Sequence, residues 1–151
     1  MVVMPGGETS THIDAAPEVV YDLVADITRM PQWSPETYRA HWVGGATEAR
    51  VGARFRGWNK LGPIRWCTDP VIDAAERGKV LTFTTTFFGR GRITTWSYRF
   101  QPEDGGTRIT ELWHEEDGIL GRITGNARRA EMLQKGMQET LARVKAAAEA
   151  A

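Results

Sequence analysis

The sequence predicts one α+β domain over residues 1–151, in which a curved antiparallel sheet wraps around a long C-terminal helix and two short helices follow the first strand. Three observations lead to this fold class. Apolar residues recur every three or four positions near the C-terminus, the middle of the chain alternates between apolar and polar residues, and short glycine-rich turns separate the alternating segments. Because such turns cannot hold crossover helices, neighbouring strands should pair antiparallel.

The N-terminal segment is expected to form one strand and two short helices. The strand covers Glu8–Ile13, and the first helix begins near Pro17, because proline suits a position where no N–H is needed. A second helix is expected over Ile27–Met30, after which Pro31 and Pro35 should hold the residues between them in an extended or turning path. The apolar stripe of the first helix consists of Val20, Leu23, Val24 and Ile27.

Six strands are expected in the middle of the chain. In three of them apolar and polar side chains alternate, which is typical of a sheet with one covered face. Trp96, Tyr98 and Phe100, for example, alternate with polar residues. The expected strands are Tyr38–Val43, Arg54–Asn59, Ile64–Val71, Val80–Phe87, Arg92–Gln101 and Thr107–His114.

The C-terminal segment predicts a long amphipathic helix. Charged residues occupy most positions between its apolar ones, so it has one apolar face that needs a large apolar partner. The sheet is the only candidate for that partner, which is why the sheet should curve around this helix. The apolar positions are Leu120, Ile123, Ala127, Ala130, Leu133, Met137, Leu141 and Val144.

The composition of the chain argues against several classes of binding partner. The chain has 19 Lys and Arg against 19 Asp and Glu, so it lacks the basic excess of a nucleic-acid or anionic-membrane binder. No apolar stretch approaches the ~20 residues of a membrane-spanning helix, and no basic region followed by an apolar run marks a leader peptide. The single cysteine, Cys67, fits a reducing compartment. We therefore expect a cytoplasmic protein, and the sequence leaves a homodimer open.

Motifs for metals, cofactors and nucleophiles are missing from the sequence. The three histidines, His12, His41 and His114, fall on different expected strands and lack the spacing of metal ligands. Neither glycine-rich phosphate-binding pattern is present, and no G-x-S-x-G motif marks a serine nucleophile. We therefore expect no metal and no cofactor.

Two polar residues are expected on the apolar face of the sheet. Glu111 shares its side of the strand with Ile109 and would have a raised pKa in an apolar pocket, where it could move a proton or bind a ligand hydroxyl. An outward-facing glutamate paired with arginine is the alternative. Asn59 shares a side with Phe55 and could offer its amide to a ligand, or could instead belong to the following turn.

The sequence has six tryptophans, more than its five phenylalanines or three tyrosines. Trp96 lies on the apolar side of its strand and is expected to line a cavity, whereas Trp33 is expected at the lip of that cavity. Trp58 is expected to face outward, beside a basic strip that includes Arg54 and Arg56. These outward residues are compatible with binding of a macromolecular partner.

Several segments resemble a known family in their order and spacing. They are Thr11–Asp26, Pro31–Pro35, Gly52–Gly57, Trp96–Phe100 and Gly105–Glu111. The pattern resembles the polyketide cyclase/dehydrase group of the START-like superfamily, also called SRPBCC or helix-grip proteins, over about residues 8–144. This resemblance implies a helix-grip fold with a deep pocket between the sheet and the long helix. Members bind lipids, sterols, polyketides or other apolar molecules, and some catalyse cyclisation or dehydration.

Three functions are compatible with that resemblance. The first is binding or carriage of an apolar small molecule, and the lack of a recognisable catalytic constellation favours it. The second is a polyketide aromatase/cyclase or dehydratase with Glu111 as acid or base, and the third is a regulatory or toxin-like protein with a macromolecular partner. The residues expected to contact a ligand are Trp33, Phe55, Asn59, Phe83, Trp96, Tyr98, Ile109, Glu111 and Met137.

Overall fold

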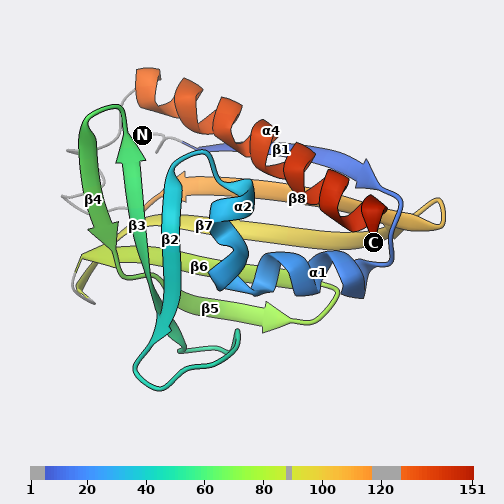
Figure 1. Cartoon of the computed structure of the whole chain (residues 1–151), viewed down its shortest axis with the longest axis horizontal. Helices are drawn as coiled ribbons and strands as arrows, with labels where there is room; N and C mark the ends of the chain where they lie inside the picture. The colour runs from blue at the N-terminus through green and yellow to red at the C-terminus, as the bar shows by residue number, and fades with distance from the viewer. Residues whose placement is uncertain (1–5, 88–89, 117–126) are drawn as a thin grey trace.

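The computed structural model describes residues 6–87, 90–116 and 127–151. Its N-terminal part consists of β1 (Gly6–Ile13), α1 (Pro17–Ala25), the 3-10 turn η1 (Ile27–Arg29) and α2 (Met30–Trp33) (Figure 1). The elements that follow are β2 (Thr37–Val43), β3 (Arg54–Leu61), β4 (Ile64–Thr68), β5 (Val71–Glu76), β6 (Val80–Phe87), β7 (Arg90–Glu103), β8 (Gly106–Glu115) and α4 (Ala127–Ala150). The predicted α+β class is confirmed.

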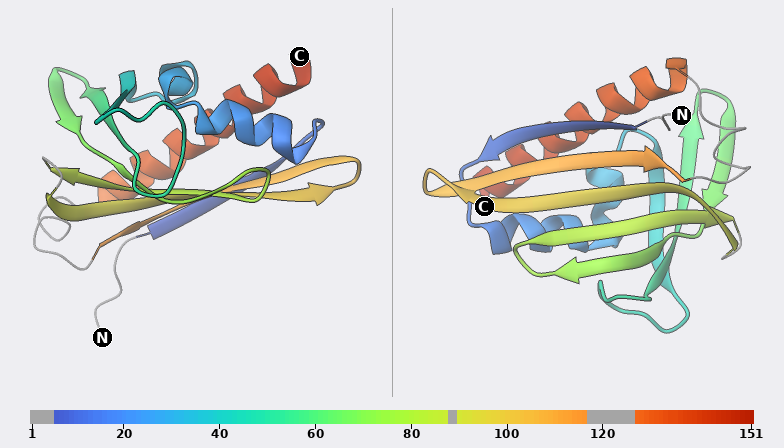
Figure 2. Two further views of the ribbon diagram at one scale, coloured as in Figure 1. Left: turned by 90° about the horizontal axis from the view of Figure 1, so that it is seen from below. Right: turned by 180° about the vertical axis from the view of Figure 1, so that it is seen from behind.

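One antiparallel sheet forms the body of the molecule. Its strand order is β1-β8-β7-β6-β5-β3-β2, and β4 pairs with β3 outside this path. The helices α1, α2 and α4 all lie over the same face of the sheet (Figure 2). The predicted arrangement, a curved sheet with the C-terminal helix packed on it and two short helices after the first strand, is confirmed.

Irregular pairing accompanies the curvature of the sheet. The register shifts between Thr37 and Arg39 in β2, between Ile72 and Ala74 in β5, and beside Thr86 in β6. An extra residue in one strand bends that strand and increases its twist. The sheet therefore has a concave face, which the three helices cover only in part.

The core fills the part of the concave face that lies under α1 and the C-terminal half of α4. Val20 of α1 and Val144 of α4 have no exposed surface, and Leu141 is 2% exposed. The ring of Tyr21 meets the ring of Phe100 of β7 edge-on, with their centroids 5.4 Å apart. The apolar stripe of α1 and the described part of the stripe of α4 are thus the faces that pack on the sheet.

The helix α4 is amphipathic, because one stripe of its side chains is buried. Met137, Leu141, Val144 and Ala148 are buried at intervals of three or four residues, while Gln138 between them is exposed. None of the helices in the described part of the chain is both long enough and apolar enough to span a membrane. Leu120 and Ile123, which the sequence places at the start of this helix, lie outside the described residues.

The predicted single strand Ile64–Val71 is wrong, because the structure divides it into β4 and β5. Pro70 lies at the break and has no N–H for a strand ladder. Asp69 beside it binds the guanidinium of Arg56, with Nε and Oδ1 2.8 Å apart. Seven strands rather than six therefore follow α2.

Of the two paths expected directly after Pro31, extended or turning, the chain takes the turning one. α2 continues through Gln32 and Trp33 before the chain becomes extended at Ser34. Pro31 lies in the first turn of this helix, where a backbone N–H has no acceptor within the helix. Proline, which lacks this N–H, therefore loses no hydrogen bond there. The short helix turns Trp33 inward, and this orientation contributes to the site described next.

Candidate functional site

A cavity of about 570 Å³ lies between the concave face of the sheet and α4. Strands β3, β4, β6, β7 and β8 supply its sheet wall, and α2, the segment after it, and α4 supply the opposite wall. The short strands β3 and β4 curl up beside the N-terminal end of α4 (Figure 1). The volume lies within the roughly 300–1,000 Å³ typical of small-molecule pockets.

Most of the residues expected to contact a ligand do line this cavity. They are Trp33, Phe55, Asn59, Phe83, Trp96, Tyr98, Glu111 and Met137. Ile109 does not: it is fully buried in the core, where it pairs across the ladder with Phe100. Because α1 packs over this pair through Tyr21, the space above Ile109 is filled and the cavity begins two cross-strand pairs further along β8, at Glu111.

Glu111 lies inside the cavity wall and is 3% exposed. The hydroxyl of Tyr98 donates a hydrogen bond of 2.7 Å to its Oε2, and its Oε1 has no hydrogen-bond partner among the described residues. Burial raises the pKa of Glu111 from 4.5 to about 8, against the opposing effect of the Tyr98 hydrogen bond. At pH 7 this carboxyl is therefore mainly neutral and can donate a hydrogen bond or a proton.

A second buried carboxyl, Glu115, lines the cavity from the same strand and is 6% exposed. Its Oε2 has no hydrogen-bond partner in the described part of the chain, and burial raises its pKa. Sequence reasoning missed this residue, although the alternation that places Glu111 inward also places Glu115 inward.

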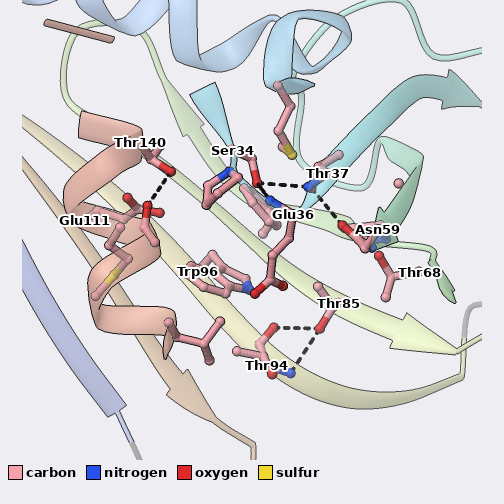
Figure 3. Close-up of a pocket in the computed structure, with 18 of the residues that line it drawn as sticks. Ser34, Glu36, Thr37, Asn59, Thr68, Thr85, Thr94, Trp96, Glu111 and Thr140 are labelled. Carbon is pink, nitrogen blue, oxygen red and sulfur yellow. Dashed lines mark hydrogen bonds between the residues drawn. The ribbon is translucent and has the colours of Figure 1, made fainter. Parts of the chain in front are cut away.

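Asn59 belongs to β3 and not to a turn, because that strand continues to Leu61. Its Oδ1 accepts a hydrogen bond of 2.7 Å from Thr37 Oγ1, as Figure 3 shows at one side of the cavity. Trp33 is 4% exposed, so it belongs to the cavity wall and not to a lip. Its indole Nε1 has no hydrogen-bond partner within the described residues.

An ion pair closes one side of the cavity. Arg129 of α4 donates to both carboxylate oxygens of Glu36, with both N–O distances 2.6 Å, and its guanidinium lies 5.7 Å from the ring centre of Trp66 on β4. All three residues line the cavity. We call this group the Arg129 clasp; it joins α4 to the segment between α2 and β2 and to the curled edge of the sheet.

Two of the outward residues noted in the sequence, Trp58 and Arg56, contact other residues of the protein. Trp58 is half-buried and is not among the residues lining the cavity; its ring lies 4.8 Å from that of His41 and 4.6 Å from the guanidinium of Arg39. Arg56 of the basic strip is bound to Asp69. Trp58 and Arg56 therefore both have contact partners within this protein.

The three histidines lie apart from one another. His12 Nδ1 is 2.9 Å from Glu103 Oε2, His41 stacks on Trp58, and His114 is exposed on β8. Within the described ranges, no three His, Cys, Asp or Glu side chains gather in a way that could hold a metal ion.

Comparison with known families decides the family of this chain. Residues 4–149 match the family described as polyketide cyclase/dehydrase and lipid transport. The chain belongs to this family. The resemblance noted in the sequence is thereby confirmed, and the polyketide cyclase/dehydrase and lipid transport family includes both enzymes and ligand carriers. No curated protein matches the sequence.

Solved structures share the fold over nearly the whole chain. The Polyketide_cyc-like protein Cgl2372 from Corynebacterium glutamicum is 27% identical, with a TM-score of 0.63 over 96% of this chain and 91% of that one. Major latex-like protein 151 from Panax ginseng is 12% identical, with a TM-score of 0.74 over 97% and 99%. The di-domain ARO/CYC StfQ of steffimycin biosynthesis is 18% identical, with a TM-score of 0.68 over 95% of this chain and 44% of that one. The last two show the fold alone.

Proposed function

We propose that this protein binds and carries an apolar small molecule, such as a lipid or a polyketide, in the cavity between the sheet and α4. The observation that carries the proposal is the cavity itself, which stays open in a core that is otherwise closely packed. Protein interiors leave few voids larger than a water molecule, so a cavity of about 570 Å³ is retained for an occupant. Membership of the polyketide cyclase/dehydrase and lipid transport family supports this reading.

Aromatic rings in contact with one another form much of the cavity wall. Phe55 meets Phe83 edge-on at 5.3 Å, and Phe83 lies 6.4 Å from Tyr98. Trp96 rests beside Trp113 with their ring centres 6.3 Å apart. Rings held in this way offer a large apolar surface at little conformational cost to the protein, which suits an apolar or ring-bearing ligand.

Tryptophan fluorescence tests the proposal directly, because Trp33, Trp66 and Trp96 all line the cavity. Titration with fatty acids, sterols and aromatic polyketides should give saturable quenching with at least one of these classes. Mass spectrometry of the purified protein should also find a small molecule that co-purifies with it. The proposal fails if no class quenches saturably and no molecule co-purifies.

The Arg129 clasp is expected to control exchange of the occupant. Glu36→Gln should weaken the ion pair to Arg129 and speed dissociation of the bound uncharged probe N-phenyl-1-naphthylamine about fivefold, which corresponds to about 1 kcal/mol. Stopped-flow fluorescence measures this rate. The matched control is Glu139→Gln, which alters a half-exposed pair with Arg143 outside the cavity lining and should leave the rate unchanged. Equal rates in wild type and Glu36→Gln would contradict a role in exchange.

Glu111 favours a second candidate, a polyketide aromatase/cyclase or dehydratase. A neutral carboxyl with a pKa of about 8, in contact with Tyr98 inside a cavity, can give a proton to a bound carbonyl or hydroxyl and take one back. The fold shared with an ARO/CYC protein supports this candidate as an analogy. Glu111→Gln should then abolish turnover of an aromatic polyketide precursor while binding, measured by quenching, is retained. Unchanged turnover would end this candidate.

A further inference from the structure

The cavity has two polar ends on the same side of one strand. Glu111 and Glu115 both belong to β8, are both at least nine-tenths buried, and each has a carboxylate oxygen without a hydrogen-bond partner in the described part of the chain. Four residues of strand separate their Cα atoms by about 13 Å. A buried polar atom without a partner is unfavourable unless something else binds it, so each oxygen is a place for a ligand atom.

Each end includes further polar groups. Tyr98 lies opposite Glu111 in the ladder between β7 and β8, and its hydroxyl binds the Glu111 carboxyl. At the other end Thr94 lies opposite Glu115, and Thr85 Oγ1 donates to Thr94 O at 3.2 Å. These pairs place hydrogen-bonding groups on neighbouring strands at both ends of the cavity.

An aromatic side chain, Trp96, lines the cavity between the two ends. Trp96 precedes Tyr98 and follows Thr94 on the inward side of β7, and Trp113 lies opposite it on β8. Figure 3 shows Trp96 between Glu111 on one side and the Thr85–Thr94 pair on the other. An aromatic surface of this kind matches the face of a ring system.

We infer that the cavity takes a neutral, flat, ring-bearing molecule with a hydrogen-bonding group at each end, one held by Glu111 with Tyr98 and the other by Glu115. The inference rests on the proposed function and names its ligand class. A fatty acid has one polar end and leaves one carboxyl unsatisfied, and its carboxylate would lie beside a buried acid. A rigid ring system carries its polar groups at a fixed separation and loses little entropy on binding.

Three probes with one skeleton test this inference: anthracene, its 2-hydroxy derivative and its 2,6-dihydroxy derivative. Tryptophan quenching gives the Kd of each for wild type, for Glu115→Met and for Glu8→Met, the last a matched change at an exposed glutamate of β1. Wild type should bind the dihydroxy probe about tenfold more tightly than the monohydroxy probe, since each satisfied buried group contributes about that factor. Glu115→Met should remove this preference, and Glu8→Met should keep it.

The outcomes separate this inference from the proposed function. If Glu115→Met keeps the tenfold preference, or if wild type binds anthracene as tightly as the dihydroxy probe, the two-ended ligand is wrong and the apolar cavity remains a binding site. If fatty acids or sterols quench and none of the anthracenes does, the ligand class is wrong and binding stands. If no compound quenches, this inference fails, and if in addition no molecule co-purifies, the proposed function fails with it. Thermal unfolding of each variant shows that a lost preference does not come from a lost fold.

Discussion

Replacing Glu111 by glutamine is expected to stabilise the protein by about 3 kcal/mol at pH 7. In the folded protein burial raises the pKa of this carboxyl to about 8, whereas in the unfolded chain it has its ordinary value of 4.5. Between these two pH values the folded state holds a proton that the unfolded state has released, so the stability of wild type falls as pH rises from 4.5 to 8 and is constant above. Glutamine has the same shape, needs no proton, and avoids this loss.

Denaturant unfolding between pH 4.5 and 8.5 measures the effect. The difference in the free energy of unfolding between Glu111→Gln and wild type should be smallest at pH 4.5 and should grow by up to ~1.4 kcal/mol per pH unit. Tyr98→Phe removes the hydrogen bond that lowers the pKa of Glu111, so the fall in stability should extend to higher pH. Glu8→Gln, at an exposed position, is the control and should match wild type. A pH-independent difference for Glu111→Gln would contradict a protonated carboxyl at this site.

The elements with a clear period were predictable from the sequence. In β7 and β8 the two-residue alternation assigns Tyr98 and Glu111 to the concave face, and the three-to-four-residue spacing of α4 places Met137 against the cavity. A one-residue change of register would turn every side chain of a strand to the other face, so the alternation carries most of the information about the site. The break at Pro70 has a signal in the sequence, because proline lacks the N–H of a strand ladder, whereas the change of partner strand from β3 to β6 depends on distant residues.

Other features depend on contacts between distant parts of the chain. The sequence separates Glu36 from Arg129 by 93 positions, and neither lies in a motif that pairs them. Ile109 lies on the same side of β8 as Glu111, so the alternation predicts that it faces the cavity. Only the position of α1 over Phe100 shows that the space above Ile109 is filled. The cytoplasmic location and a homodimer stay predictions.

Gly57→Phe is expected to weaken binding of a cavity-filling ligand at least ~100-fold, which corresponds to about 2.7 kcal/mol. Gly57 lies in β3 between the inward residues Phe55 and Asn59 and lines the cavity, so a ring at this position projects into the space that a ligand needs. Phenylalanine favours strands, and glycine weakens them, so the variant should unfold at the same temperature as wild type or higher.

Gly57→Ala separates a filled cavity from a damaged strand. An added Cβ would lie 3.6 Å from Thr68 Oγ1 and 3.9 Å from Asn59 Nδ2, which are ordinary contacts, so this variant should bind like wild type. Quenching titrations with the ligand class that binds wild type, together with thermal unfolding, compare the three proteins. If Gly57→Phe binds as tightly as Gly57→Ala, the ligand does not occupy this cavity. Loss of binding in the phenylalanine variant alone, with its fold retained, would place the ligand between β3 and α4, because only that change takes away volume there.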